Sequence, residues 1–150
     1  YGEEHTHREP QQLSDISSFY HAFGLRVKES NFERVDHISV ECEFMHYLLF
    51  KEAYALSNAA TDDAGVCHQA SARFLKEHLG RWAPSFALKL GRYAQQGFLK
   101  DMADFLFSYI VQDCAWLGVT AGPEDLLIRP VQEKEDSGCV SCSLRPVTPQ

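Results

Sequence analysis

Apolar side chains recur every three or four residues along most of the chain, a spacing that places them on one face of an α-helix. The first such run contains Leu13, Ile16, Tyr20 and Phe23. Gly24 follows it, as expected of a residue that ends a helix. No stretch of β-branched residues alternates with polar residues in the manner of a strand. The pattern predicts an all-α fold with helices over residues 10–23, 36–56, 61–79, 84–96 and 98–117.

Glycine and proline set the expected ends of these helices. Pro10 can open the first helix because it has no backbone N–H to lose. Gly80 is expected to end the third helix and Pro84 to begin the fourth. After Gly118, prolines and polar residues replace the helical period. We therefore expect a single-domain multi-helix globule over residues 1–118 and an extended, irregular tail over residues 119–150 that is not a separate domain.

Composition narrows the class of protein. The chain has 150 residues, of which 45% are apolar, enough to form the core of one domain without disulfides or a metal. Its net charge of −7 argues against nucleic acid as a partner, because phosphate binding requires clustered Lys and Arg. No apolar stretch is long enough for a membrane span. Cys42, Cys67 and Cys114 fall on apolar helical faces, which favours free core cysteines in a reducing compartment.

Polar residues at the start of the second expected helix are the first candidates for function. Asp36 could present its carboxylate to a cationic partner, or it could cap the helix by accepting from the amides of Ile38 or Ser39. His37 precedes Glu41 by four residues, which allows a side-chain pair on one helix face. Glu41 lies in an apolar sector, where an acid is costly unless it is paired. It either bonds to a neighbouring helix, which we favour, or borders a polar cleft.

Cysteine supplies the second candidate. Cys139 and Cys142 form a C-x-x-C in a tail rich in Ser, Gly and Pro. One such pair provides two of the four ligands of a zinc site, and His5 and His7 could complete it only if the two termini meet. The chain has no nucleophile elbow, phosphate-binding loop or dinucleotide fingerprint. We therefore expect no catalytic residues and no cofactor. A small metal- or redox-binding protein that uses the Cys pair, and a structural subunit of a larger complex, are the alternatives.

Three segments resemble one known family. Residues 33–45, ERVDHISVECEFM, are similar to the signature of the TorD/DmsD/NarJ family of redox-enzyme maturation chaperones, although Val35 stands where many members have proline. Residues 74–86, FLKEHLGRWAPSF, resemble a second family run, and residues 19–25, FYHAFGL, resemble the segment that precedes the signature. Together the resemblance extends over about residues 13–93, more than half of the chain.

The resemblance implies a function that the residue pattern alone does not. Members are all-α cytoplasmic proteins that bind the twin-arginine signal peptide or N-terminus of a molybdopterin-dependent catalytic subunit, of the dimethyl sulfoxide or nitrate reductase type. They hold it until the cofactor is inserted. Members usually have more helices before this region, so the resemblance also implies missing N-terminal sequence. Trp82, Phe86 and Tyr93 recur at helical spacing, where aromatic residues are more often part of the core than a platform for a ligand. Carried over, the peptide site consists of Asp36, His37, Glu33, Glu41, Trp82 and Phe86.

Overall fold

The computed structural model describes residues 9–27 and 34–126 of the chain. Within these ranges it contains five α-helices and no strand, which confirms the all-α prediction. The helices are α1 (Glu9–Ala22), α2 (Ile38–Ser57), α3 (Thr61–Glu77), α4 (Leu79–Ala94) and α5 (Phe98–Trp116). Among the described residues, no helix has the combination of length and apolar character needed to cross a bilayer.

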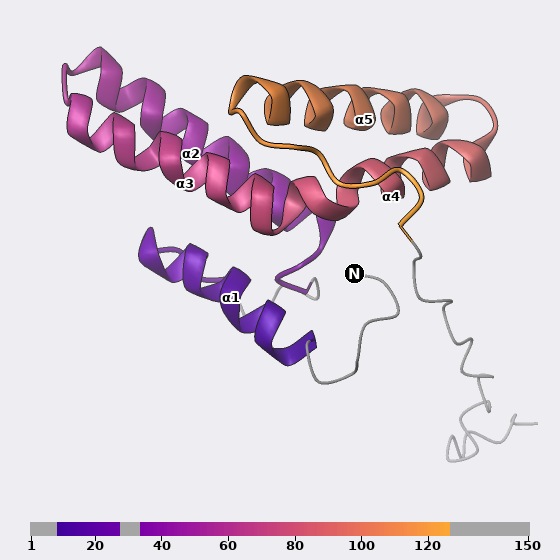
Figure 1. Ribbon diagram of the computed structural model, residues 1–150, viewed down its shortest axis with the longest axis horizontal. Helices are drawn as coiled ribbons and strands as arrows, with labels where there is room; N and C mark the ends of the chain where they lie inside the picture. Colours follow the sequence, from indigo (N-terminus) through magenta and orange to yellow (C-terminus); the bar gives the residue numbers. More distant parts are fainter. Residues whose placement is uncertain (1–8, 28–33, 127–150) are drawn as a thin grey trace, which may run out of the picture.

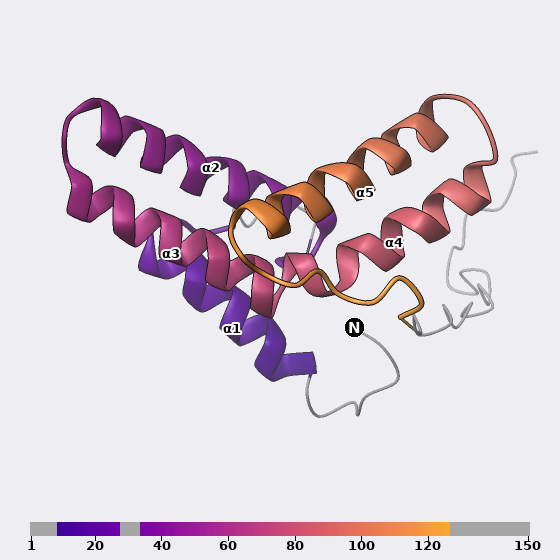
Figure 2. The same ribbon diagram turned by 45° about the horizontal axis from the view of Figure 1, so that its top comes forward.

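The last four helices form two hairpins, α2 with α3 and α4 with α5, which diverge like the arms of a V (Figure 2). α3 and α4 follow each other almost directly at His78, so the two hairpins meet there. Gly97, with a φ of 81°, lies in the reversal between α4 and α5, where a side chain would be strained. α1 lies against the α2–α3 hairpin, on the side away from α5 (Figure 1).

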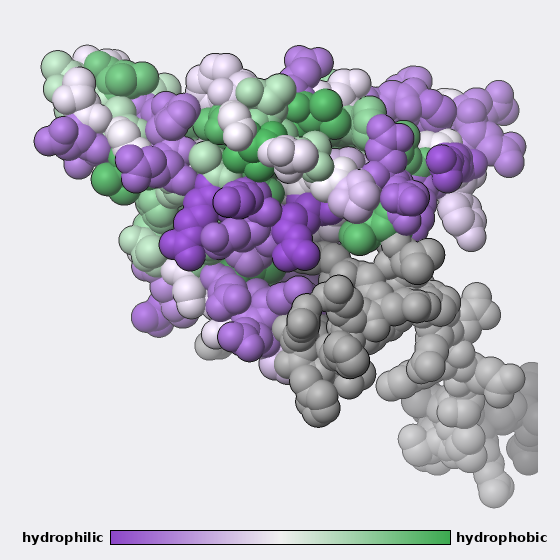
Figure 3. All heavy atoms as spheres, viewed as in Figure 1, coloured by the Kyte–Doolittle hydropathy of each residue, from purple (hydrophilic) through white to green (hydrophobic). Residues whose placement is uncertain are grey.

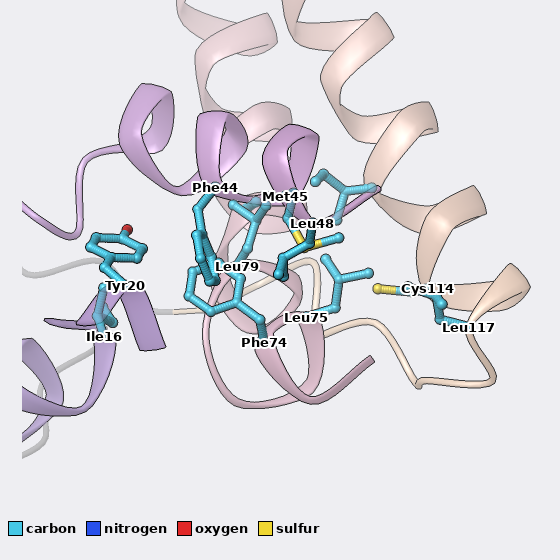
Figure 4. Packing of buried hydrophobic residues seen from close by; sticks show 12 residues of the cluster. Ile16, Tyr20, Phe44, Met45, Leu48, Phe74, Leu75, Leu79, Cys114 and Leu117 are labelled. Carbon is cyan, nitrogen blue, oxygen red and sulfur yellow. The ribbon is translucent and has the colours of Figure 1, made fainter. Parts of the chain in front are cut away.

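The core is centred on Phe44 of α2 and Phe74 of α3, whose ring centroids lie 4.8 Å apart. From α1, Tyr20 packs against Phe44 at 4.8 Å and Phe19 against Phe74 at 5.3 Å. Edge-to-face contacts of this kind each stabilise by about 0.5–1.5 kcal/mol beyond the burial of apolar area. They hold α1 on the hairpin. The buried cluster is completed by Ile16, Met45, Leu48, Leu75, Leu79, Ala83, Ile110, Cys114 and Leu117 (Figure 4).

The boundary between α3 and α4 differs from the prediction. Gly80 does not end α3, because α3 already ends at Glu77 and Gly80 is the second residue of α4. Pro84 does not begin a helix, because α4 begins at Leu79 and continues through Pro84. Gly80 has a packing role instead. A Cβ at this position would lie 2.5 Å from the Leu75 carbonyl oxygen and 3.0 Å from the Cys114 sulfur. The glycine therefore permits the close approach of α5 to the junction, rather than terminating a helix.

Pro84 has a consequence for the chain that follows α5. A proline inside a helix removes the hydrogen bond to the carbonyl four residues earlier, here that of Gly80. This carbonyl instead accepts from the backbone N–H of Gly122 at 2.8 Å. Gly122 lies so close to α4 that a Cβ on it would stand 2.0 Å from the Arg81 carbonyl oxygen. A glycine is therefore required at position 122 by space.

The described part of the expected tail, residues 119–126, is irregular as predicted, but it packs on α4. Val119 and Ala121 contact the buried cluster. Farther along, the Leu126 carbonyl oxygen accepts from Ser85 Oγ at 3.2 Å and from Lys89 Nζ at 2.6 Å. We call residues 118–126 the C-terminal segment. The expected tail beyond it, residues 127–150, lies outside the described residues.

His78 is an unusual residue at the junction of the hairpins. Its side chain is 4% exposed, and neither ring nitrogen has a hydrogen-bond partner among the described residues. The ring instead packs edge-on against Phe19 at 5.3 Å and lies 5.2 Å from Phe74. Burial lowers the pKa of His78; the charges of Glu77 and Asp15 oppose this shift, and those of Arg81 and Arg73 add to it. The native fold therefore holds this imidazole neutral.

The lowered pKa of His78 predicts acid sensitivity. Since the unfolded chain binds a proton near pH 6.5 and the native state resists it, the free energy of unfolding should fall as pH drops below about 6.5. His78→Leu removes the titrating group and should flatten this part of the curve, measured by urea denaturation between pH 5 and pH 8. His46→Gln, a change at an exposed histidine, is the control. Equal slopes for wild type and His78→Leu would contradict the assignment.

The close approach at position 122 predicts a second effect on stability. Gly122→Ala forces a methyl group onto the α4 backbone and should cost about 1–3 kcal/mol, the usual penalty of overpacking. Gly65→Ala is the matched control, because its Cβ would meet open space on α3 and should stabilise by about 0.5–1 kcal/mol. Thermal melts of both variants test this. An unchanged melting temperature for Gly122→Ala would show that the C-terminal segment does not pack as described.

Candidate functional site

The N-cap of α2 is not the residue that one of the two interpretations of Asp36 proposed. His37, not Asp36, is the N-cap: its backbone is extended, and its Nδ1 accepts from the Ser39 N–H at 3.3 Å. The same nitrogen lies 2.8 Å from Ser39 Oγ. These contacts fit a neutral ring with its proton on Nε2. Asp36 precedes the cap by one residue, so the reading of Asp36 as an N-cap is wrong.

Asp36 is engaged in a different contact. Its Oδ1 accepts from Arg34 Nε at 2.9 Å and its Oδ2 from Arg34 Nη2 at 3.0 Å. The backbone of this turn is tied down separately, because the His37 N–H donates to the Arg34 carbonyl at 3.0 Å and Tyr20 Oη donates to the Val35 carbonyl at 2.8 Å. Asp36 is therefore presented on a fixed turn, with a guanidinium on its carboxylate.

Glu41 forms the link between the two hairpins. Its side chain is fully buried, and its two oxygens lie 3.3 and 3.4 Å from Nε1 of Trp82 on α4. This confirms the prediction that Glu41 pairs with a neighbouring helix. Trp82 in turn packs edge-on against Phe86 at 5.4 Å, and both rings are half-buried. Three of the six residues expected in the peptide site thus form one contiguous cluster.

The other expected site residues lie near the same end of α2. Glu41 follows His37 by one helical turn, and its N–H donates to the His37 carbonyl at 3.0 Å. Asp36 is the residue next to His37. Glu33 lies outside the described residues. The fold therefore brings Asp36, His37 and Glu41 together at the start of α2, and Glu41 connects them to the aromatic pair on α4.

A pocket that the sequence analysis did not identify lies beside this turn. Its volume is about 310 Å³, and α2 contributes Val40, Glu43, Phe44 and Tyr47 to its wall. The remaining wall comes from Tyr20 at the end of α1 and from the connector residues Leu25, Arg26 and Val27. The connector follows no helical period, so nothing in the sequence indicated that its side chains would turn toward α2. The lining is mainly apolar, with one acid, Glu43, and one base, Arg26.

The surroundings of the turn are acidic. Burial raises the pKa of Tyr20 far above its ordinary value, and the negative charges of Glu41, Asp36 and Glu43 raise it further. Burial also raises the pKa of Cys42 to about 11, with a further contribution from Glu41. The negative charge of Glu41 contributes at both groups, and those of Asp36 and Glu43 contribute at Tyr20. A cationic group would be attracted to these surroundings.

A second apolar surface lies between the hairpins. On the face shown in Figure 3, several apolar side chains lie in the upper middle of the molecule, among polar ones. α5 exposes Phe98, Met102, Phe105 and Trp116 at spacings that place them on one side of the helix. The Trp116 ring lies 5.6 Å from His68 of α3, so this side of α5 faces the other hairpin. Exposed apolar surface of this kind commonly marks a site of interaction.

Nothing in the described ranges suggests a metal centre. Residues 9–27 and 34–126 contain no group of three or more His, Cys, Asp and Glu side chains placed to hold an ion. Cys67 and Cys114 are buried and Cys42 is half-buried, all three as free thiols, in agreement with their expected place in the core. The predicted pair Cys139 and Cys142 lies outside the described residues, as do His5 and His7.

Comparison with known proteins identifies the family. The sequence pattern of the nitrate reductase delta subunit family matches residues 1–88, more than half of the chain. The chain belongs to this family. The matched region includes α1, α2, α3 and the turn with Asp36 and His37, together with Trp82 and Phe86. All of the residues expected in the peptide site therefore lie within the part of the chain that defines the family.

Curated relatives of this nitrate reductase delta subunit family protein are assembly chaperones. The chain is 33% identical over 89 residues to the selenate reductase assembly chaperone protein of Thauera selenatis, a match of 57% of this chain and 45% of the relative. It is 33% identical over 101 residues to the perchlorate reductase assembly chaperone protein of Dechloromonas aromatica, covering 67% and 44%. It is 27% identical over 95 residues to the chaperone protein TorD of Vibrio parahaemolyticus, covering 63% and 43%.

The chain thus spans less than half the length of the curated relatives it matches. No solved structure matches the chain. The resemblance noted in the sequence is confirmed by these comparisons, and the relatives carry names of chaperones rather than of enzymes.

The buried contact between Glu41 and Trp82 predicts a specific cost. Trp82→Phe keeps the aromatic ring but removes the indole N–H donor to a buried carboxylate, so it should lower the free energy of unfolding by about 1–3 kcal/mol. Trp116→Phe is the matched control, because Trp116 is 63% exposed and phenylalanine keeps a ring beside His68, so its change should stay within about 0.5 kcal/mol. Chemical denaturation measures both. Equal losses for the two variants would show that the Trp82 hydrogen bond contributes nothing specific.

Proposed function

We propose that this chain is a cytoplasmic chaperone for a molybdopterin-dependent oxidoreductase of the dimethyl sulfoxide or nitrate reductase type. It binds the signal peptide or N-terminus of the catalytic subunit and holds it until the cofactor is inserted and assembly is complete. Membership of the family and the names of the relatives support the class of function. The proposal goes further than this class: it names the signal peptide as the bound segment, the catalytic subunit as the client, and cofactor insertion as the moment of release.

One observation carries the proposal for the peptide site. At the start of α2, the carboxylates of Asp36, Glu41 and Glu43 act on one region, and an apolar pocket of about 310 Å³ lies next to it. A signal peptide has a basic stretch followed by an apolar stretch. Acids beside an apolar pocket complement that order of side chains. Glu43 is exposed and the Asp36 side chain is 22% exposed, whereas Glu41 is fully buried and supports the site through its contact with Trp82.

The residues divide into two roles under this proposal. Asp36 contacts the basic part of the peptide, and Glu43 is one of the residues that line the pocket, which receives an apolar side chain. His37 and Glu41 hold the site in place, the first by capping α2 and the second by joining α2 to Trp82. Trp82 and Phe86, half-buried on α4, extend the apolar surface next to Glu41.

The test is calorimetric titration of a client signal peptide into wild type, Asp36→Asn and His37→Ala, alongside thermal melts. Asp36→Asn removes a charge-assisted contact and should weaken binding by about 1.5–3 kcal/mol at low salt. Its melt should change little, because Asp36 does not cap α2. His37→Ala removes the cap and should cost about 1 kcal/mol of stability.

Asp101→Asn is the matched control, since it removes one exposed acid from the first turn of α5. It should bind the peptide as wild type does, apart from a small effect that disappears in salt. If Asp36→Asn melts like wild type and also binds like wild type at low salt, the carboxylate is not part of the site.

A further inference from the structure

The contact between Arg34 and Asp36 has the form of a recognition contact. Two adjacent N–H groups of the guanidinium, on Nε and Nη2, meet the two oxygens of the carboxylate at 2.9 and 3.0 Å. Such a two-point contact fits the planar fork of arginine, and an ammonium group cannot reproduce it. The Asp36 side chain is 22% exposed and that of Arg34 is 58% exposed. The carboxylate is therefore largely covered, while the arginine on it remains open to solvent.

We propose that Arg34 is an internal competitor for the peptide site. It occupies Asp36 in the free chaperone, and an arginine of the client peptide binds Asp36 by displacing it. The inference rests on the proposed function and adds to it the chemical group that Asp36 selects, a guanidinium, and the step by which the site becomes available.

The architecture of the turn allows this exchange. Three contacts hold the turn without the Arg34 side chain: the backbone bond from His37 to the Arg34 carbonyl, the Tyr20 hydroxyl on the Val35 carbonyl, and the His37 cap on Ser39. The Arg34 side chain can therefore leave while the Asp36 carboxylate stays in position. Ion pairs of exposed groups are weak, so an incoming arginine meets little resistance.

The exchange determines what the contact contributes to binding. One guanidinium–carboxylate pair breaks and another forms, so the net gain from the charged contact is small compared with a site that starts empty. A lysine of the peptide would displace Arg34 without forming a two-point contact of its own, because an ammonium group cannot meet both carboxylate oxygens in the same way. Arg34 thus lowers affinity in general while it preserves the preference for arginine over lysine.

The experiment is titration of a synthetic peptide at low salt into the full chain. The peptide has two adjacent arginines followed by about 12 apolar residues, the order found in signal peptides, and a second peptide carries lysines in their place. The proteins are wild type, Arg34→Gln, Arg34→Lys, Asp36→Asn and the double variant Arg34→Gln with Asp36→Asn. Arg92→Gln is the control for net charge, because Arg92 is exposed near the end of α4, within its last turn.

We expect Arg34→Gln to bind the arginine peptide about two- to fivefold more tightly than wild type, the factor that a weak ion pair of about 0.4–1 kcal/mol represents. Arg34→Lys should gain less, and Arg92→Gln should show no comparable gain. The lysine peptide should bind more weakly throughout and gain by a similar factor, because release of Asp36 helps any cation that binds it. In the Asp36→Asn background, removal of Arg34 should have no effect, since there is no carboxylate to release.

Three results would overturn the proposal. If wild type binds the peptide and Arg34→Gln binds it equally or less well, there is no competition, although the proposed function stands. If the gain persists in the Asp36→Asn background or matches that of Arg92→Gln, the effect is one of net charge. If neither wild type nor Arg34→Gln binds the peptide, both the competition and the proposed peptide site fail.

Discussion

The position of α2 relative to α4 depends on one buried carboxylate, that of Glu41, which has no exposed surface. Glu41 cannot be buried without a donor, and Trp82 supplies one across the junction of the two hairpins. This requirement fixes how α2 lies against α4, and it therefore fixes where the start of α2 stands relative to the aromatic pair on α4. The turn with Asp36 and His37, the Tyr20 contact and the adjacent pocket all depend on that placement.

The elements of the fold were predictable from sequence because helical periodicity depends on local spacing alone. The errors arose where tertiary contacts override local tendencies. Gly80 and Pro84 are strong boundary signals in an isolated segment, but here a glycine is needed for the approach of Cys114. The proline is tolerated because the carbonyl it releases accepts a hydrogen bond from Gly122.

The candidate site was predictable to a smaller extent. The burial of Glu41 followed from its apolar sector. Its partner, Trp82, lies 41 residues later in the sequence, and no local pattern identifies a partner at such a separation. The choice between Asp36 and His37 as the cap depends on the conformation of one turn, and the contact with Arg34 draws Asp36 away from the helix. The pocket wall contributed by Leu25 and Val27 was not foreseeable, since the connector has no period from which to read an orientation.

The hydrogen bond from Gly122 to Gly80 also implies an order of folding. The Gly80 carbonyl becomes a defined acceptor only after α4 has formed around Pro84, and Gly122 reaches it only after α5 has folded back beside α4. We therefore expect the C-terminal segment to dock after both helices of the second hairpin. A ribosome would have to release both helices of the second hairpin before this segment could close over them, so a nascent chain remains open at α4 until its synthesis has passed residue 126.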